Sequence, residues 1–422
     1  MPETAPARKP WAVLAYTIAE DTHSSTLLDT TARGELEALC DAADLRKVSL
    51  AAQVDFKGRR GVYRGAVTRV QPKRRGFSDI DPKRFELWKQ VEASVEAGEA
   101  TVRLQRDPSD LNATDVDVLE EFLRFGRAEC PADRYVVSFF GHAAGPLGLF
   151  EDRTPGSHTQ DTMRLPALVR GFKGAGSRAD VVIFRDCYMN CLETAYQLRN
   201  STEFLVATQA MAPASGAWPW RAFMQKLGEG GSAYDVAFGV ARALAEFLDD
   251  PANREDLEAV PYSLLDLSAA AGIVAPLTAL TDALDAARQD PARRRAYARA
   301  LEGSRVGSPQ RGKLPGDPAL LDVPTLCARL AKLEGQPVAE PAAALGRAVA
   351  GTLVRWHHSQ TRHHKGTALF YKPVRPADLE ESYLQATDET VAADDAAHYR
   401  ALALSRATGW HRIALDPLPV DD

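Results

Sequence analysis

The chain has 422 residues, of which 45 % are hydrophobic, and it carries a formal net charge of −6 at pH 7. This length suits one large domain with an extension or two domains, and the apolar fraction is ample for a buried core. The negative charge, with Lys and Arg spread along the chain, argues against nucleic acid or an anionic membrane as the main partner.

Strands and helices are expected to alternate through the first half of the chain. In chain order, the pattern predicts a buried strand over 11–16, a helix over 31–43, a strand over 47–56, a more exposed strand over 61–70, helices over 81–98 and 112–127, a strand over 134–140, a short helix over 165–172, a strand over 179–184, a helix over 188–199 and a strand over 203–210. The helix over 81–98 is predicted from its Asp-Pro start and its Gly98 end, and Asp115 is the expected cap of the next helix. Strands that are apolar on both faces and alternate with helices predict an α/β fold, with a mostly parallel central sheet covered by helices on both faces.

Beyond about residue 230 the chain becomes rich in Ala, Leu and Arg at helical spacing, which predicts a mainly helical C-terminal extension. The segment "GTALFYKP" near the end reads as a late strand that returns to the sheet. The expected organisation is therefore a core over 1–250, a helical extension over 251–365 and a returning strand and helix over 366–422.

The five cysteines are too few for a disulfide framework in a chain of this length; they are Cys40, Cys130, Cys187, Cys191 and Cys327. Cys187 and Cys191 have no second pair at metal-ligand spacing, so a zinc site is not expected. The N-terminus lacks a long apolar run, and no stretch reaches the roughly 18 apolar residues of a membrane span. We therefore expect a reducing, cytoplasmic setting without membrane contact.

Two reactive side chains follow buried strands of the predicted sheet. His142 follows the strand "YVVSFF", and Cys187 follows the strand "VVIF" 45 residues later, with one helix between them. If the two strands are neighbours in a parallel sheet, their carboxyl ends bring His142 close to Cys187. An imidazole can accept the thiol proton and later protonate a leaving amine, and a helix N-terminus beside the sulfur would favour the thiolate. The competing interpretation is that Cys187 is a packing residue, as most cysteines at strand ends are.

At this point the sequence resembles the clostripain family of cysteine peptidases, which have a caspase-like fold. The resemblance rests on "WAVLAYTIAED", on "PADRYVVSFFGHAAG", on "ADVVIFRDCYMNCLETAYQL" and on "EFLVATQAMAPASGAWPW". It covers roughly residues 11–235 well and 366–415 loosely. It implies that Cys187 is the nucleophile, that His142 is the general base and that proteins or peptides are the substrates, without a cofactor.

The chain departs from the family pattern around the nucleophile. The family usually has Asp-Ala-Cys, where the aspartate helps to bind Arg or Lys, but here that position is Arg185. No acid occurs from Gln209 to Trp218, a stretch where the family tends to carry one. Arg185, Asp186, Gln209 and Trp218 are the expected substrate-binding residues, and the residue before the scissile bond is expected to be acidic or neutral rather than basic.

Asp186, Cys191 and the run from His357 to His364 each have a structural interpretation beside a functional one. For Asp186 the favoured interpretation is an N-cap of the following helix, and direct substrate binding is the alternative. Cys191 is expected to face the core. The run from His357 to His364 reads as a solvated helix end more readily than as a metal site, and no compact acidic loop suggests calcium.

The sequence leaves two classes of function open. The leading one is a cysteine endopeptidase, and the alternative is a non-catalytic scaffold that uses the same fold for binding. An activating partner protein and self-cleavage between His142 and Cys187 are both compatible with the resemblance. The basic residues available for such a cut are Arg153, Arg164, Arg170, Lys173 and Arg178.

Overall fold

The computed structural model describes residues 8–19, 27–42, 46–56, 62–67, 90–97, 100–106, 111–152, 161–176, 178–212, 218–250, 260–306, 319–359, 364–372 and 389–419. The chain divides into two compact units. Unit 1 comprises Met1–His142, Leu149–Asp186 and Pro213–Asp256, and unit 2 comprises Ala143–Gly148, Cys187–Ala212 and Leu257–Asp422. The boundaries at 250 and 365 that the sequence suggests stay a prediction.

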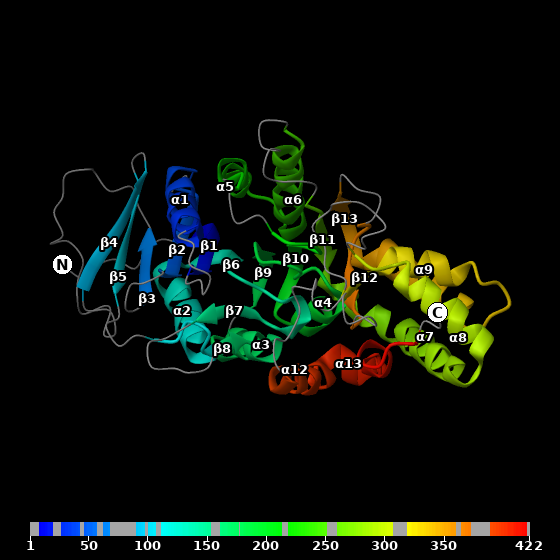
Figure 1. The fold of residues 1–422 in the computed structure, drawn as a ribbon. Coiled ribbons are helices and arrows are strands. Elements are labelled where there is room, and N and C mark those ends of the chain that lie inside the picture. The colour runs from blue at the N-terminus through cyan, green and yellow to red at the C-terminus, as the bar shows by residue number, and fades with distance from the viewer. Residues whose placement is uncertain are drawn as a thin grey trace. The chain divides into compact units, whose positions relative to one another are not determined.

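Unit 1 is built on seven strands in the order β9, β6, β1, β2, β3, β5, β4 (Figure 1). Their bounds are β1 (Lys9–Ile18), β2 (Val48–Asp55), β3 (Val62–Val67), β4 (Gln90–Ala97), β5 (Ala100–Arg106), β6 (Ala132–Phe140) and β9 (Ala179–Phe184). Strands β9, β6, β1 and β2 run parallel, whereas β3, β5 and β4 continue antiparallel. A short hairpin of β7 (Leu149–Asp152) and β8 (Asp161–Met163) lies outside this sheet.

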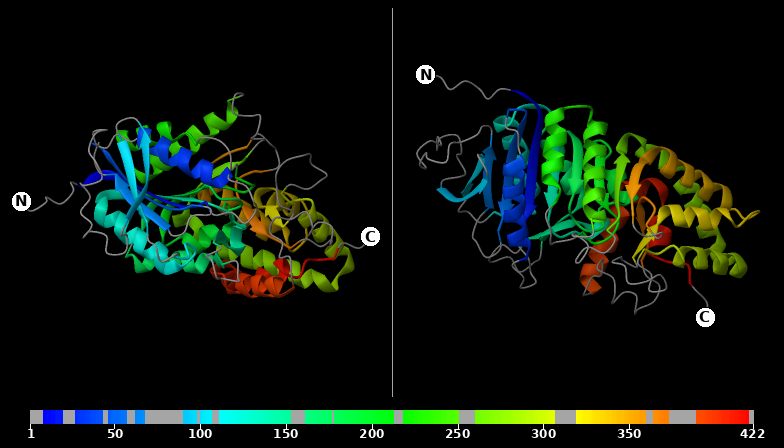
Figure 2. Two further views of the ribbon diagram at one scale, coloured as in Figure 1. Left: turned by 60° about the vertical axis from the view of Figure 1, so that its left-hand side comes forward. Right: turned by 90° about the horizontal axis from the view of Figure 1, so that it is seen from above.

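Helices cover both faces of the unit 1 strands, as the apolar strand sequences predict. Helices α1 (Leu27–Ala42), α5 (Trp220–Glu229) and α6 (Ala233–Asp249) lie on one face, and α2 (Val116–Glu129) and α3 (Leu165–Gly174) lie on the other (Figures 1 and 2). The expected cap of α2 is confirmed, because the Asp115 side chain accepts a hydrogen bond from the N–H of Asp117 at 3.0 Å. The apolar stripe of α2 is also buried as expected.

Unit 2 combines antiparallel strands with many helices. Its strands are β10 (Thr202–Thr208), β11 (Tyr262–Asp266) and β13 (Val354–His358), and β12 (Leu320–Asp322) with β14 (Ala368–Phe370). Its helical elements are η3 (Gly145–Leu147), α4 (Leu192–Leu198), η5 (Leu267–Ile273), α7 (Val274–Ala286), η6 (Ala287–Gln289), α8 (Pro291–Glu302), α9 (Val323–Ala331), α10 (Ala339–Ala348), the π-helix η8 (Val349–Leu353), α12 (Glu389–Ala401), α13 (Ala403–Thr408) and α14 (His411–Ala414).

A buried carboxylate joins three elements of unit 2. Glu193 on α4 accepts hydrogen bonds from the Tyr399 hydroxyl on α12 at 2.6 Å and from the N–H of Phe370 on β14 at 3.0 Å. Burial raises the pKa of Glu193, and it also raises the pKa of Tyr399 well above its usual range. The raised pKa values mean that burial favours the neutral form of both groups. A hydrogen bond between neutral side chains, and not an ion pair, therefore connects α12 to α4.

Four expected features differ from the structure. Gln90–Ala97 is strand β4 and not part of a helix, because its period-two alternation of apolar residues lets it pair with β5. The late strand β14 pairs with β12 in a separate two-stranded sheet and does not join the central sheet as expected. The segment Val354–His358, expected to end a helix, is strand β13, which pairs with β11. Arg64 on β3 is buried, so β3 is less exposed than its charges suggested.

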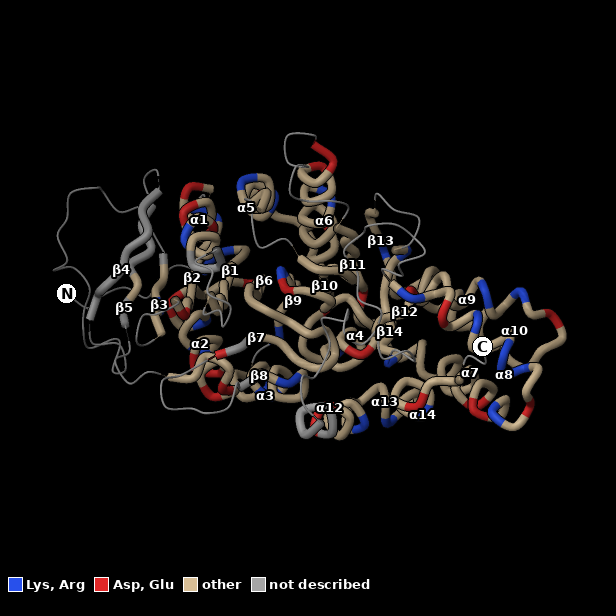
Figure 3. The backbone as a smooth tube through the Cα atoms, viewed as in Figure 1, with Lys and Arg blue, Asp and Glu red and all other residues tan. Residues whose placement is uncertain are grey.

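The distribution of charge follows the sequence expectation. In the segments that the structure describes, Lys and Arg are interspersed with Asp and Glu in each unit and do not gather into one basic stripe (Figure 3). One helical stretch among the described residues, Leu267–Gln289, is long and apolar enough to cross a membrane, and 39 % of its most apolar window is buried. One such stretch is weak evidence for a span, since core helices of soluble proteins share these properties, and the absence of membrane contact stays a prediction.

Candidate active site

The strands that precede His142 and Cys187 are neighbours in the sheet, as the sequence predicts. Strand β6 pairs in parallel with β9, with Val136 opposite Val181 and Phe139 opposite Phe184. The N–H of Arg185 extends this pairing by donating to the carbonyl oxygen of Phe139 at 3.0 Å. The chain therefore leaves both strands at the same edge of the sheet, toward His142 after β6 and toward Cys187 after β9.

His142 follows β6 by two residues and is half-buried. Its carbonyl oxygen accepts the N–H of Phe150 at 2.6 Å, and Phe150 itself has a positive φ of 66°. His142 belongs to unit 1 and Cys187 to unit 2, so the pairing of their side chains stays a prediction.

The segments that follow His142 and Cys187 meet within unit 2. The turn η3 begins at Gly145, which has a φ of +56°. A Cβ at this position would lie 3.1 Å from the carbonyl oxygen of Tyr188, the residue after Cys187. Glycine is needed here both for the left-handed backbone and for the close approach to Tyr188.

Cys187 lies in a turn and not at the start of a helix. Helix α4 begins at Leu192 with Cys191 in the N-cap position, so the expected helix N-terminus beside Cys187 and the expected cap by Asp186 are both wrong. The reason is that the Tyr188 and Asn190 N–H groups donate to the carbonyl oxygens of Ala210 and Thr208, at 2.9 and 2.8 Å, in place of helical bonds.

The hydrogen bonds of Tyr188 and Asn190 to Ala210 and Thr208 form a two-stranded ribbon, which brings a backbone N–H donor to the sulfur of Cys187. The N–H of Ala212 donates to Sγ of Cys187 at 3.3 Å. A hydrogen bond to sulfur favours the thiolate over the thiol, so Ala212 supplies the stabilisation that was expected from a helix N-terminus. Nothing in the sequence marks this residue as a donor, because any residue except proline offers the same backbone group.

The other four cysteines are buried, and none of the five, all of them described, forms a disulfide. Burial raises the pKa of the Cys130 and Cys327 thiols to about 12 and raises that of Cys191 well above its usual range. Cys191 is also confirmed as core-facing, with its Sγ 3.1 Å from Oγ1 of Thr194. Cys187, which is half-buried, is thus the cysteine best placed to meet a substrate.

Arg185 does not present its guanidinium to solvent. The residue is 2 % exposed, and its side chain forms an ion pair with Glu35 on α1. Its Cζ atom lies 5.0 Å from the ring centroid of Phe140 and 4.7 Å from that of Trp218. Trp218, expected to bind substrate, therefore contacts Arg185 in unit 1. Glu35 and Phe140 were not expected from the sequence, since nothing local marks a partner so far away in the chain.

Gln209 and Asp186 are buried as well. The Gln209 amide donates to Oδ1 of Asp322 at 3.1 Å and accepts the N–H of Gly366 at 3.2 Å, which favours a structural role over the expected substrate contact. Asp186 is fully buried, and this burial raises its pKa well above the usual range of a carboxyl group. Both residues stay candidates from the sequence alone.

Metal-ligating groups do not cluster in the described part of the chain, where no three His, Cys, Asp or Glu side chains come together. His357 and His358 are consecutive residues on β13, so their side chains point to opposite faces of the strand. His363 lies outside the described residues.

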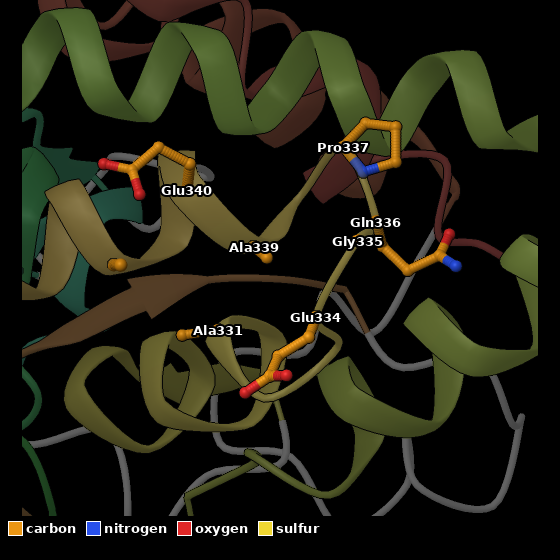
Figure 4. Close-up of a pocket in the computed structure, with 8 residues that line it drawn as sticks. Ala331, Glu334, Gly335, Gln336, Pro337, Ala339 and Glu340 are labelled. Carbon is orange, nitrogen blue, oxygen red and sulfur yellow. The ribbon is translucent and has the colours of Figure 1, made fainter.

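A cavity of about 530 Å³ lies where α9 and α10 are joined (Figure 4). Its lining contains two carboxylates, Glu334 and Glu340, and the second of these pairs with Arg347 at 2.9 Å. None of the site residues expected from the sequence lines this cavity. It is therefore not part of the candidate active site.

Comparison with known proteins agrees with the resemblance seen in the sequence. A model of the clostripain family, Peptidase_C11, matches residues 89–310, which is more than half of the chain and includes His142 and Cys187. No curated protein matches in sequence.

Solved structures of similar fold include an inactive zymogen C11 protease from Parabacteroides distasonis, with a TM-score of 0.63, 16 % identity, and coverage of 96 % of this chain and 99 % of that one. A secreted C11 cysteine protease from Bacteroides thetaiotaomicron in complex with an irreversible peptide inhibitor has a TM-score of 0.60 and 17 % identity, and the match covers 95 % and 99 % of the two chains. At these identities the structures show the fold alone, which is the α/β arrangement expected above.

Proposed function

The chain belongs to the clostripain family and is a cysteine peptidase, and on that premise we propose that Cys187 is its nucleophile and His142 its general base. The observation that carries this proposal is the state of the five cysteines. Four are buried, whereas Cys187 is half-buried and its sulfur accepts the N–H of Ala212. Burial disfavours a thiolate and a hydrogen bond to sulfur favours it, so reactivity should concentrate at Cys187.

The parallel pairing of β6 with β9 supports His142 as the base, because both strands lead to the same edge of the sheet. In the proposed reaction, His142 takes the proton of Cys187, and the sulfur attacks the peptide carbonyl carbon. The C–N bond then breaks, and the leaving amine takes the proton from His142. Water hydrolyses the resulting thioester, releases the acid product and restores the thiol.

Substitution of the two residues tests the proposal. Cys187→Ala should abolish hydrolysis of an unstructured protein such as casein, and His142→Ala should reduce it by several orders of magnitude, since groups that act as a unit show such losses singly. Cys191→Ala is the matched control and should retain most of the activity. Near-normal turnover in Cys187→Ala would disprove the assignment. A wild type that cleaved no substrate at all would instead favour the non-catalytic scaffold.

We further propose that the enzyme does not cleave after Arg or Lys. The support is Arg185, whose buried positive charge lies two residues before the nucleophile. The sequence predicts an acidic or a neutral residue before the scissile bond, but the Arg185 guanidinium that would bind an acidic side chain is already paired with Glu35. A neutral residue before the scissile bond is therefore the proposed preference. Fluorogenic peptides that differ only in Ala, Asp or Arg at that position measure it directly.

Self-cleavage after a basic residue between His142 and Cys187 should then be absent or slow. Arg170 and Lys173 lie on helix α3, where a protease cannot bind them in extended form, and Arg153 lies outside the described residues. Intact mass after incubation tests this, and rapid Cys187-dependent fragmentation would contradict it. An activating partner and a cytoplasmic location stay proposals, and one of the similar structures is of a protease described as secreted.

A further inference from the structure

Three side chains of unit 1 surround the guanidinium of Arg185. Glu35 lies on α1, Phe140 is the last residue of β6, and Trp218 precedes α5. The carboxylate of Glu35 pairs with the guanidinium, and the two aromatic rings lie 5.0 and 4.7 Å from its Cζ. All three residues are buried.

Aromatic rings and a carboxylate together are well suited to bind a guanidinium group. A planar, weakly hydrated cation is stabilised by the faces of aromatic rings and by a carboxylate that matches its N–H groups. The binding groups come from three separate elements of unit 1, namely α1, β6 and the segment before α5. Trp218 also packs on Trp220, with ring centroids 5.4 Å apart.

We propose that Glu35, Phe140 and Trp218 form a guanidinium-binding site that the chain fills with its own Arg185, and that this internal occupation excludes basic substrate side chains. The first part stands on the contacts within unit 1. The second part rests on the proposed function, because it assumes that Cys187, two residues after Arg185, is the nucleophile. A vacated site should bind a free guanidinium compound, since a buried Glu35 without a cation is costly.

Binding is tested with methylguanidinium and the full-length Arg185→Ala protein. The melting temperature is measured from zero to a few tens of millimolar methylguanidinium at constant ionic strength, with NaCl as the balancing salt. We expect a saturable increase for Arg185→Ala, and no increase for wild type or for the double variant Glu35→Gln with Arg185→Ala. An Arg185→Ala protein that shows no saturable increase, or a double variant that shows the same increase, would overturn the proposal.

If Arg185→Ala does not fold unaided, the yield of refolded Arg185→Ala protein is compared in methylguanidinium, urea and NaCl. Recovery of soluble protein by methylguanidinium, and not by equal concentrations of urea or NaCl, supports the site. Equal recovery by all three, or recovery by none, contradicts it.

Activity supplies a separate readout for the second part. Arg185→Ala should gain roughly tenfold or more in the ratio of kcat/KM for an Arg peptide over an Ala peptide, and the double variant should lose that gain. Methylguanidinium should inhibit this new cleavage competitively. Saturable binding without any change in the peptide ratio would overturn the exclusion of basic side chains. A wild type that is inactive on every peptide would instead count against the proposed function and leave the binding result standing.

Discussion

The backbone N–H of Ala212 lies 3.3 Å from Sγ of Cys187 and donates a hydrogen bond to it. This contact connects the loop after β10 with the turn after β9. It depends on the ribbon that pairs Tyr188 and Asn190 with Ala210 and Thr208. A hydrogen bond to sulfur favours the thiolate, so this loop contributes to the environment of the Cys187 sulfur.

Removing this donor should slow the reaction of the sulfur. Ala212→Pro lacks the N–H, so we expect alkylation of Cys187 by iodoacetamide at pH 7 to slow several-fold and its pH dependence to move to higher pH. Ala212→Gly keeps the N–H and should behave like wild type. Peptide mapping by mass spectrometry gives the rate for each cysteine, and equal rates for the two variants would refute a role for this hydrogen bond.

The glycine at the start of η3 should matter for activity as well as for stability. Gly145→Ala introduces a Cβ 3.1 Å from the Tyr188 carbonyl oxygen at a φ of +56°, so it should displace the segment beside Cys187 and, if Cys187 is the nucleophile as proposed, lower kcat/KM. Gly176→Ala is the matched control, since it has a φ of +60° but no atom within 4 Å of the new Cβ. Both should lose about 1 kcal/mol or more of stability from backbone strain. If Gly176→Ala lost as much activity as Gly145→Ala, the argument would fail.

The Glu35–Arg185 ion pair should contribute strongly to stability. Glu35→Gln leaves a buried guanidinium without its counter-charge, at a cost of about 3–5 kcal/mol in the free energy of unfolding. Asp41 lies on α1 like Glu35 and forms an exposed ion pair with Arg221 on α5. Asp41→Asn breaks this pair and should cost less than about 1 kcal/mol in the free energy of unfolding. Urea unfolding of the two variants measures the difference, and similar small losses would mean that the buried pair is worth little.

The buried carboxyl of Glu193 should make stability depend on pH. Burial raises its folded-state pKa above the ordinary value of 4.5, so the folded state holds the proton more tightly than the unfolded state does. This contribution to stability is complete below pH 4.5 and is lost as the pH rises through the raised pKa. Glu193→Gln keeps an acceptor oxygen for Tyr399 but cannot ionise. Its stability relative to wild type should therefore increase from pH 5 to pH 8 in urea unfolding, and a constant difference would contradict this.

The parts of the fold that the sequence predicts best are those set by local pattern. Strands β1, β6 and β9 follow from uninterrupted apolar runs, and their parallel pairing follows from the helices between them. Strand β4 is not predictable in this way, because Asp-Pro and Gly98 are typical of helix ends, whereas pairing with β5 decides the structure. Helix α4 starts late for a similar reason, since Tyr188 and Asn190 donate to the neighbouring ribbon.

The candidate site was predictable only where residue type carries the chemistry. Cys187 and His142 stand out as reactive groups after buried strands. Glu35 and the Ala212 N–H do not, because a tertiary ion pair and a backbone donor leave no mark on the local sequence. Arg185 departs from the family pattern in the sequence, but its burial against Glu35 depends on how α1 packs and not on the residues around it.

Competitive alkylation of the five cysteines tests the central claim most directly. The native protein is treated with a limiting amount of iodoacetamide near neutral pH, and residual peptidase activity is followed beside the modified fraction of each cysteine. We predict that Cys187 reacts first, that activity falls in proportion to its modification, and that His142→Ala slows this reaction and not those of the buried cysteines. Preferential modification of another cysteine, or full activity after Cys187 is alkylated, would contradict the account.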